Sequence, residues 1–85
     1  MDAHPPTGWT EVDGALERTF TFGNFAEALA FVNRVGDAAE GADHHPDILM
    51  HDYKLVTTRW RTHSADAITT KDHDLAVRCD ALAAG

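Results

Sequence analysis

Two adjacent histidines, His44 and His45, stand directly before Pro46 and are the residues of this chain best suited to proton transfer. An unperturbed imidazole has a pKa of about 6.5, so it donates or accepts a proton near neutral pH with little adjustment. His63 and Asp72 could complete such a site from further along the chain, since a carboxylate beside an imidazole fixes its tautomer or raises its basicity. We therefore expect acid and base catalysis by these three histidines and Asp72.

Simpler roles remain open for several of the candidate residues. Asp72 lies three residues after Thr69, where an acid commonly caps a helix, and both roles can coexist. Glu40 could be a solvated acid at a helix end, and Tyr53 could pack on a strand. Three other histidines fall outside the pattern and are expected at the surface: His4, His51 and His73.

Histidines are also ligands for zinc and copper, so a metal site has to be weighed against proton transfer. Adjacent residues of an extended segment point to opposite sides, which keeps His44 and His45 from readily sharing one ion. The histidine spacing also matches no metal signature. We expect no metal.

The composition describes one small acidic domain of 85 residues. Such a chain buries only roughly 60% of its unfolded surface, so oligomerisation would stabilise it. Fourteen acidic and seven basic residues give a net charge of −7, which argues against binding to nucleic acid or to an anionic membrane. The single cysteine, Cys79, excludes an internal disulfide and suits a reducing compartment.

The chain shows no targeting or membrane signal. No apolar run approaches the roughly 20 residues of a membrane span, and residues 1–8 lack the features of a signal peptide. A cytoplasmic protein is expected. Pro5, Pro6 and Gly8 predict a flexible lead-in over residues 1–8, followed by a single domain over residues 9–85.

The first half of the domain reads as a hairpin followed by a helix. Asp13-Gly14 favours a tight turn between a strand at 9–12 and a strand with alternating apolar residues at 16–22. Asn24 with Glu27 predicts a capped helix start. An apolar stripe continues to about residue 40, where Gly41 would end the helix: Phe25, Ala28, Leu29, Val32, Val35 and Ala39. Because Pro46 disfavours helical geometry at His45, the histidine pair should lie in an extended connection that exposes it to a cleft.

The second half reads as two strands and a helix. The strands are expected at 48–50 and 53–62, and alternation places Trp60 and Thr62 on one face and His63 on the other. Thr69 with Asp72 opens the last helix, with an apolar stripe at Leu75, Ala76, Cys79 and Leu82. The predicted fold is α+β, in the order ββαββα: a four-stranded antiparallel sheet with two helices packed on one face.

The candidate residues occur together at a specific spacing, with Glu40 ahead of His44-His45-Pro46 and then Tyr53, His63 and Asp72. This arrangement resembles the signature of the pterin-4a-carbinolamine dehydratases. The similarity extends over nearly all of the chain, from Trp9 to Glu40 and from Thr62 to Ala76. Family members carry an N-terminal helix ahead of Trp9, so in this chain that helix is expected to be reduced or absent.

The resemblance implies a hydro-lyase that dehydrates 4a-hydroxytetrahydropterin, such as 4a-hydroxytetrahydrobiopterin, to quinonoid dihydropterin during pterin recycling. Members of the family need no metal or organic cofactor. The resemblance assigns catalysis to His44, His45, His63 and Asp72, and substrate binding to Glu40, Pro46 and Tyr53. We hypothesise that His44 and His63 share the acid and base roles, while His45 binds the hydroxyl or orients the pterin.

The resemblance also implies partners. Family members form dimers or tetramers, so a homodimer or homotetramer is expected, with the strand at 54–62 as a candidate interface edge. A functional link to an aromatic amino acid hydroxylase is a further expectation. The alternative is a non-catalytic dimerisation or assembly module of the same fold, which would have no need of three histidines at this spacing.

Overall fold

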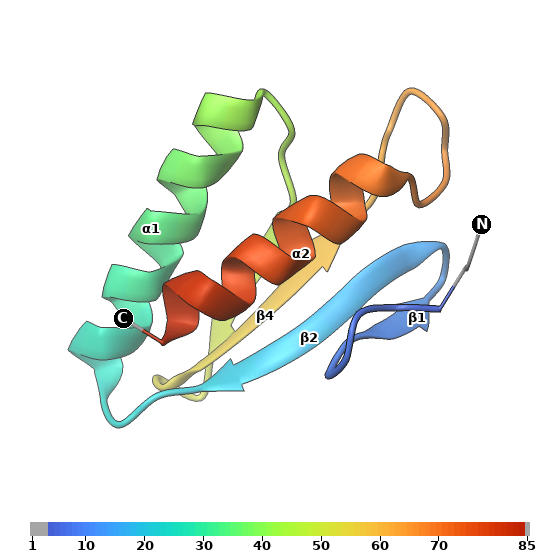
Figure 1. Ribbon diagram of the computed structural model, residues 1–85. Helices are drawn as coiled ribbons and strands as arrows, with labels where there is room; N and C mark the ends of the chain where they lie inside the picture. Colours follow the sequence, from blue (N-terminus) through green and yellow to red (C-terminus); the bar gives the residue numbers. More distant parts are fainter. Residues whose placement is uncertain (1–3, 85) are drawn as a thin grey trace.

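The computed structural model describes residues 4–84 and contains four strands and two helices. In chain order they are β1 (Thr10–Val12), β2 (Ala15–Thr21), α1 (Phe25–Ala42), β3 (Asp47–His51), β4 (Leu55–Trp60) and α2 (Thr70–Ala83). The strands form one antiparallel sheet, and both helices cover the same face of it (Figure 1). The predicted α+β fold and its ββαββα order are confirmed. The described residues ahead of β1 form turns rather than a helix.

The order of strands in the sheet is β1-β2-β4-β3. β4 pairs with β2 on one side and with β3 on the other. The suggestion that the strand at 54–62 offers an interface edge is therefore wrong, because both sides of β4 are already hydrogen-bonded. The outer strands of this sheet are β1 and β3.

The hairpin of β1 and β2 forms as predicted. Asp13 and Gly14 take φ angles of 49° and 77°, the positive values that a tight type I′ turn requires. Val12 pairs with Ala15 directly across this turn. The flexible lead-in remains a prediction, and residues 1–3 lie outside the described part of the chain.

Helix α1 begins as predicted and ends later than predicted. The Glu27 N–H donates to Asn24 Oδ1 at 2.8 Å, and the Glu27 carboxylate accepts from the Gly23 N–H at 3.2 Å. The helix continues past Gly41 to Ala42, and Asp43 ends it in the left-handed conformation, with φ at 49°. Aspartate tolerates this conformation better than most residues with a side chain. The next N–H, that of His44, donates to the carbonyl of Ala39 at 3.1 Å, so the end of the helix fixes the first histidine.

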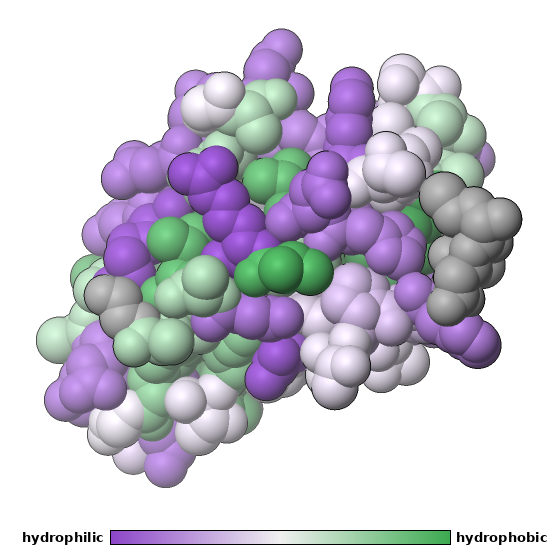
Figure 2. Space-filling view, in the orientation of Figure 1, coloured by the Kyte–Doolittle hydropathy of each residue, from purple (hydrophilic) through white to green (hydrophobic). Residues whose placement is uncertain are grey.

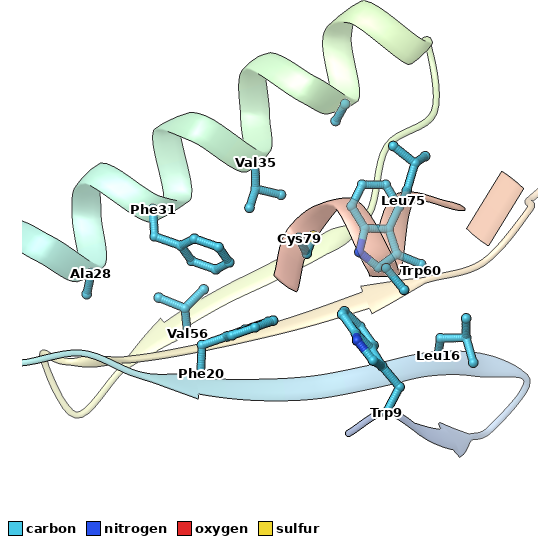
Figure 3. Close-up of a cluster of buried hydrophobic side chains, with 12 residues drawn as sticks. Trp9, Leu16, Phe20, Ala28, Phe31, Val35, Val56, Trp60, Leu75 and Cys79 are labelled. Atoms are coloured by element: carbon cyan, nitrogen blue, oxygen red, sulfur yellow. The ribbon is translucent and has the colours of Figure 1, made fainter. Parts of the chain in front are cut away.

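The core lies between the sheet and the helices (Figure 3). The alternation predicted for β4 is confirmed, since Val56, Thr58 and Trp60 are buried. Leu75, Ala76 and Cys79 of α2 are also buried, as expected.

The stripe of α1 is correct at Ala28, Val35 and Ala39 but wrong at Phe25 and Leu29, which are 54% and 42% exposed. The buried line of the helix instead runs through Phe31, three residues after Ala28 and four before Val35.

The face seen in Figure 2 mixes hydrophobic and hydrophilic side chains. In the described range, neither helix has the length and apolar character needed to cross a membrane.

Candidate active site

Asp72 is the centre of a buried hydrogen-bond network. Its Oδ2 accepts from the Thr69 N–H at 2.8 Å and from the Thr62 hydroxyl at 2.7 Å, and its Oδ1 lies 2.7 Å from His44 Nε2. The side chain has no solvent exposure. The Thr69 bond is part of the capping box that begins α2. Capping and contact with a histidine therefore coexist in one carboxylate, as the sequence had left open.

Burial and hydrogen bonding act in opposite directions on this carboxyl group. Burial raises the pKa of Asp72, but the hydrogen bonds from His44, the Thr69 N–H and Thr62 outweigh it and hold the pKa below its ordinary value of 3.8. Asp72 is therefore an anion at neutral pH and can only accept hydrogen bonds. His44 must donate its Nε2–H to it, which leaves Nδ1 of a neutral His44 with a free lone pair.

His44 is held by its surroundings rather than exposed to a cleft. It is only 9% exposed, and its ring stacks on Trp60 with centroids 6.0 Å apart and planes at 7°. The expectation that both imidazoles are exposed is wrong for His44, because the strand register points Trp60 into the core beneath it. Burial and stacking hold the His44 imidazole in one orientation, as a catalytic side chain requires during a reaction.

His45 turns to a different partner. Its Nε2 lies 2.7 Å from Glu40 Oε1, with side chains that are 56% and 78% exposed. The two neighbouring histidines thus face different groups, as expected for the extended segment that Pro46 ends. Glu40 reaches His45 from the last turns of α1.

His63 lies on the side of the sheet away from Trp60, as the alternation predicted. The guanidinium of Arg61 donates from Nη2 to His63 Nδ1 at 3.3 Å. Because Arg61 can only donate, Nδ1 is the acceptor, and the proton of the neutral ring sits on Nε2. Among residues 4–84, no hydrogen bond joins His63 to His44 or to His45.

A pocket of about 270 Å³ opens beside His63, lined by Asp13, Ala15, Asp47, Arg59, Arg61 and His63. Asp47 begins β3 immediately after Pro46, so the chain that carries the histidine pair continues into this pocket. His44 and His63 therefore lie in different environments. His44 is buried, and His63 lines a polar pocket.

The structure does not bring Tyr53 to the histidines. It lies in the turn between β3 and β4, with φ at 50° and 61% of its surface exposed. β4 separates this turn from the His63 end of the sheet, and its six residues span roughly 20 Å. Tyr53 is therefore not part of the histidine cluster within one copy of the chain.

Sequence reasoning missed the roles of Trp60, Arg59 and Arg61. The strand alternation gave the signal for all three, because it placed Trp60 on the core face and both arginines on the face of His63.

Of the other histidines, His4 is exposed, while His51 and His73 are half-buried. The described residues contain no group of three or more histidine, cysteine or acidic side chains that could hold a metal ion.

Comparison with known proteins relates these features to one family. The family model described as "Pterin 4 alpha carbinolamine dehydratase" matches residues 1–82. A relative from Picosynechococcus sp., named "Putative pterin-4-alpha-carbinolamine dehydratase", is 49% identical over 74 residues, covering 87% of this chain and 79% of its own. A relative of the same name from Thermomicrobium roseum is 49% identical over 76 residues, covering 89% and 81%.

Solved structures agree with the sequence relatives. A crystal structure of a transcriptional coactivator/pterin dehydratase from Brucella melitensis has a TM-score of 0.84 and 34% identity, over 91% of this chain and 83% of that one. A pterin dehydratase-like protein described as a RuBisCO assembly factor in the alpha-carboxysome shares the fold, with a TM-score of 0.73 and 23% identity over 95% and 92%. The chain belongs to the pterin 4 alpha carbinolamine dehydratase family.

Proposed function

We propose that this chain dehydrates 4a-hydroxytetrahydropterin to quinonoid dihydropterin by histidine acid and base catalysis, as a step of pterin cofactor recycling. Family membership supports the reaction class. The observation that carries the mechanism is the buried pair of His44 and Asp72, with 2.7 Å between Nε2 and Oδ1. A histidine held in this way by an anionic carboxylate is prepared to accept a proton.

The reaction moves two protons and no net electrons. The bond between C4a and its hydroxyl breaks as that hydroxyl gains a proton and leaves as water. N5 loses its proton, and a double bond forms between C4a and N5. Each positioned proton transfer contributes typically 10²- to 10⁴-fold to the rate, so one acid and one base are sufficient catalytic groups.

We assign the base to Nδ1 of His44, which removes the proton from N5. For the acid, the contacts of His45 and His63 support a different assignment from the hypothesis of the sequence analysis. Because His63 accepts a hydrogen bond from Arg61 at Nδ1, its Nε2–H is the group left to donate, and we assign it to binding of the hydroxyl. His45, in contact with the Glu40 carboxylate, is the better proton donor. The roles of His45 and His63 are thus exchanged relative to the sequence-based hypothesis.

The runner-up is an assembly or dimerisation module. The neighbour described as a RuBisCO assembly factor shares this fold. A module of that kind needs surface contacts but not a buried imidazole and carboxylate pair, so the contact of His44 with Asp72 favours catalysis. A homodimer or homotetramer, a cytoplasmic location and a functional link to a hydroxylase remain part of the proposal.

The assay is the dehydration of chemically generated 4a-hydroxytetrahydropterin by the chelator-treated chain, compared with its variants His45→Ala and His63→Ala. We expect the intact chain to exceed the spontaneous rate. His45→Ala should lower kcat, and His63→Ala should chiefly raise KM. Loss of activity only on chelation would reveal a metal mechanism, and a rate equal to the spontaneous one would favour the assembly module.

A further inference from the structure

The pocket beside His63 is built almost entirely from polar side chains. Ala15 is its one apolar lining residue. A volume of about 270 Å³ lies just below the usual range of small-molecule pockets, roughly 300–1,000 Å³, which suits part of a small molecule. Flat heteroaromatic rings are generally held between apolar or aromatic walls, and these are missing from the lining of this pocket.

The donors in this pocket are held in place. The Arg59 guanidinium donates from Nη2 to the Val12 carbonyl at 3.2 Å, and its Nε lies 3.2 Å from a Glu17 carboxylate oxygen. The Arg61 guanidinium is held by Asp66 at 3.0 Å and by His63 at 3.3 Å. A guanidinium has five N–H groups, so each arginine keeps donors for a ligand.

The acceptors in this pocket are not used by any other residue that the structure describes. Within residues 4–84, the carboxylates of Asp13 and Asp47 have no hydrogen-bond partner. Because Glu17 and Asp66 already pair with Arg59 and Arg61, the charges of Asp13 and Asp47 add negative charge to the lining and disfavour an anionic ligand group. Free carboxylate acceptors beside anchored guanidinium donors are suited to hydroxyl groups, which both donate and accept. The ligand group that fits carries several hydroxyls and no negative charge.

We propose that this pocket binds a polyhydroxylated substituent at C6 of the pterin substrate and thereby sets substrate specificity. The inference rests on the proposed function. C4a, where the hydroxyl leaves, is bonded to N5, and N5 is bonded to C6, so a substituent at C6 starts two bonds from the reacting carbon. If His63 binds the leaving hydroxyl, the substituent must emerge beside His63. The pocket that His63 lines is therefore where its hydroxyls meet Asp13 and Asp47.

The test compares two chemically generated 4a-hydroxytetrahydropterins, one with a 1,2-dihydroxypropyl group at C6 and one with a methyl group. The double variant Asp13→Asn/Asp47→Asn removes both charges but keeps the shapes, and asparagine suits the positive φ at position 13. We expect kcat/KM for the dihydroxypropyl substrate to fall about tenfold, because hydrogen bonds to a charged acceptor are roughly twice as strong as neutral ones. Activity on the methyl substrate should not change. Asp74→Asn, on the exposed side of α2, is the matched control.

Each other outcome has a definite meaning. Equal loss on both substrates would overturn the inference, because the pocket would then act on the ring or on His63 itself. No loss on either substrate would also overturn it and leave the proposed dehydration standing. An intact chain that is inactive on both substrates would instead refute the proposed function, so the two failures are distinguishable.

Discussion

Asp72 uses its two carboxylate oxygens for two tasks. Oδ2 accepts from the Thr69 N–H and the Thr62 hydroxyl, which fixes the start of α2, while Oδ1 accepts from His44. The helix cap thus holds the carboxylate at the right place to orient the proposed base. The same hydrogen bonds keep it ionised despite complete burial.

The variant Asp72→Asn should reverse the tautomer of His44. The Thr69 N–H still needs an acceptor, so the amide oxygen will face Thr69 and the amide nitrogen will face His44. Nε2 must then accept, and the proton moves to Nδ1, where the base is needed. We expect kcat to fall roughly 100-fold or more with little change in KM. The measurement is steady-state dehydration, with Asp74→Asn as the control, and an unchanged kcat would refute the assignment.

The lowered pKa of Asp72 also predicts how stability depends on pH. The unfolded chain takes up a proton on this group near pH 3.8, while the folded chain does so only at lower pH. The stabilisation is therefore fully present above pH 3.8 and is lost as pH falls through the folded pKa. Urea unfolding should show that the difference in unfolding free energy between the intact chain and Asp72→Asn shrinks as the pH falls below 3.8. A constant difference would mean that the pKa is not lowered.

At the scale of elements, Asp80 of α2 is joined to the N-terminal hairpin. Trp9 Nε1 donates to its carboxylate at 3.0 Å, and Arg18 Nη1 donates at 2.8 Å. Arg18 also lies over the ring of Phe20, with its guanidinium carbon 4.7 Å from the centroid. These contacts link residues more than 60 positions apart and hold α2 on β2.

Asp80→Asn should therefore destabilise the chain. We expect a loss of about 1 kcal/mol in the free energy of unfolding, because the hydrogen bonds lose a charged acceptor but the Arg18 pair is partly exposed and screened by solvent. Urea denaturation measures it, with Asp74→Asn as the reference for a surface charge without these contacts. If Asp80→Asn and Asp74→Asn had the same urea unfolding midpoint, the contacts of Asp80 would contribute nothing to stability.

Much of the fold could be predicted from local signals. The Asp13-Gly14 turn, the caps at Asn24 and Thr69 and the alternation in β4 are sequence patterns with direct physical causes. The end of α1 was harder to predict, because Asp43 and Gly41 can both adopt the conformation that ends a helix. Tertiary contacts determine that Asp43 adopts it.

The sequence predicted which residues belong to the site better than it predicted how those residues are arranged. Alternation placed His63 opposite Trp60 correctly, but whether His44 or His45 turns inward depends on the register of α1 with the sheet. That register is a long-range property, and so is the contact between His44 and Asp72, 28 residues apart.

At the scale of the whole molecule, the core includes Cys79, which is 1% exposed beside Trp60. Burial, together with the negative charge of Asp80, raises the pKa of its thiol to about 11, although contact with Trp60 partly offsets this. Native Cys79 should thus react with iodoacetamide near pH 8 far more slowly than a free thiol, with a rate that rises in parallel with unfolding in urea. Rapid labelling without denaturant would show that the core opens locally.

The central claim concerns catalysis by the pair of His44 and Asp72, and one comparison tests it most directly. The rate of dehydration of 4a-hydroxytetrahydropterin is measured for the intact chain, for His44→Ala and for His73→Ala, whose histidine is half-buried on the same helix as Asp72 but outside the network. We predict that the intact chain and His73→Ala exceed the spontaneous rate equally, while His44→Ala falls by a factor on the order of 100 or more. Equal rates for His44→Ala and the intact chain would contradict the account.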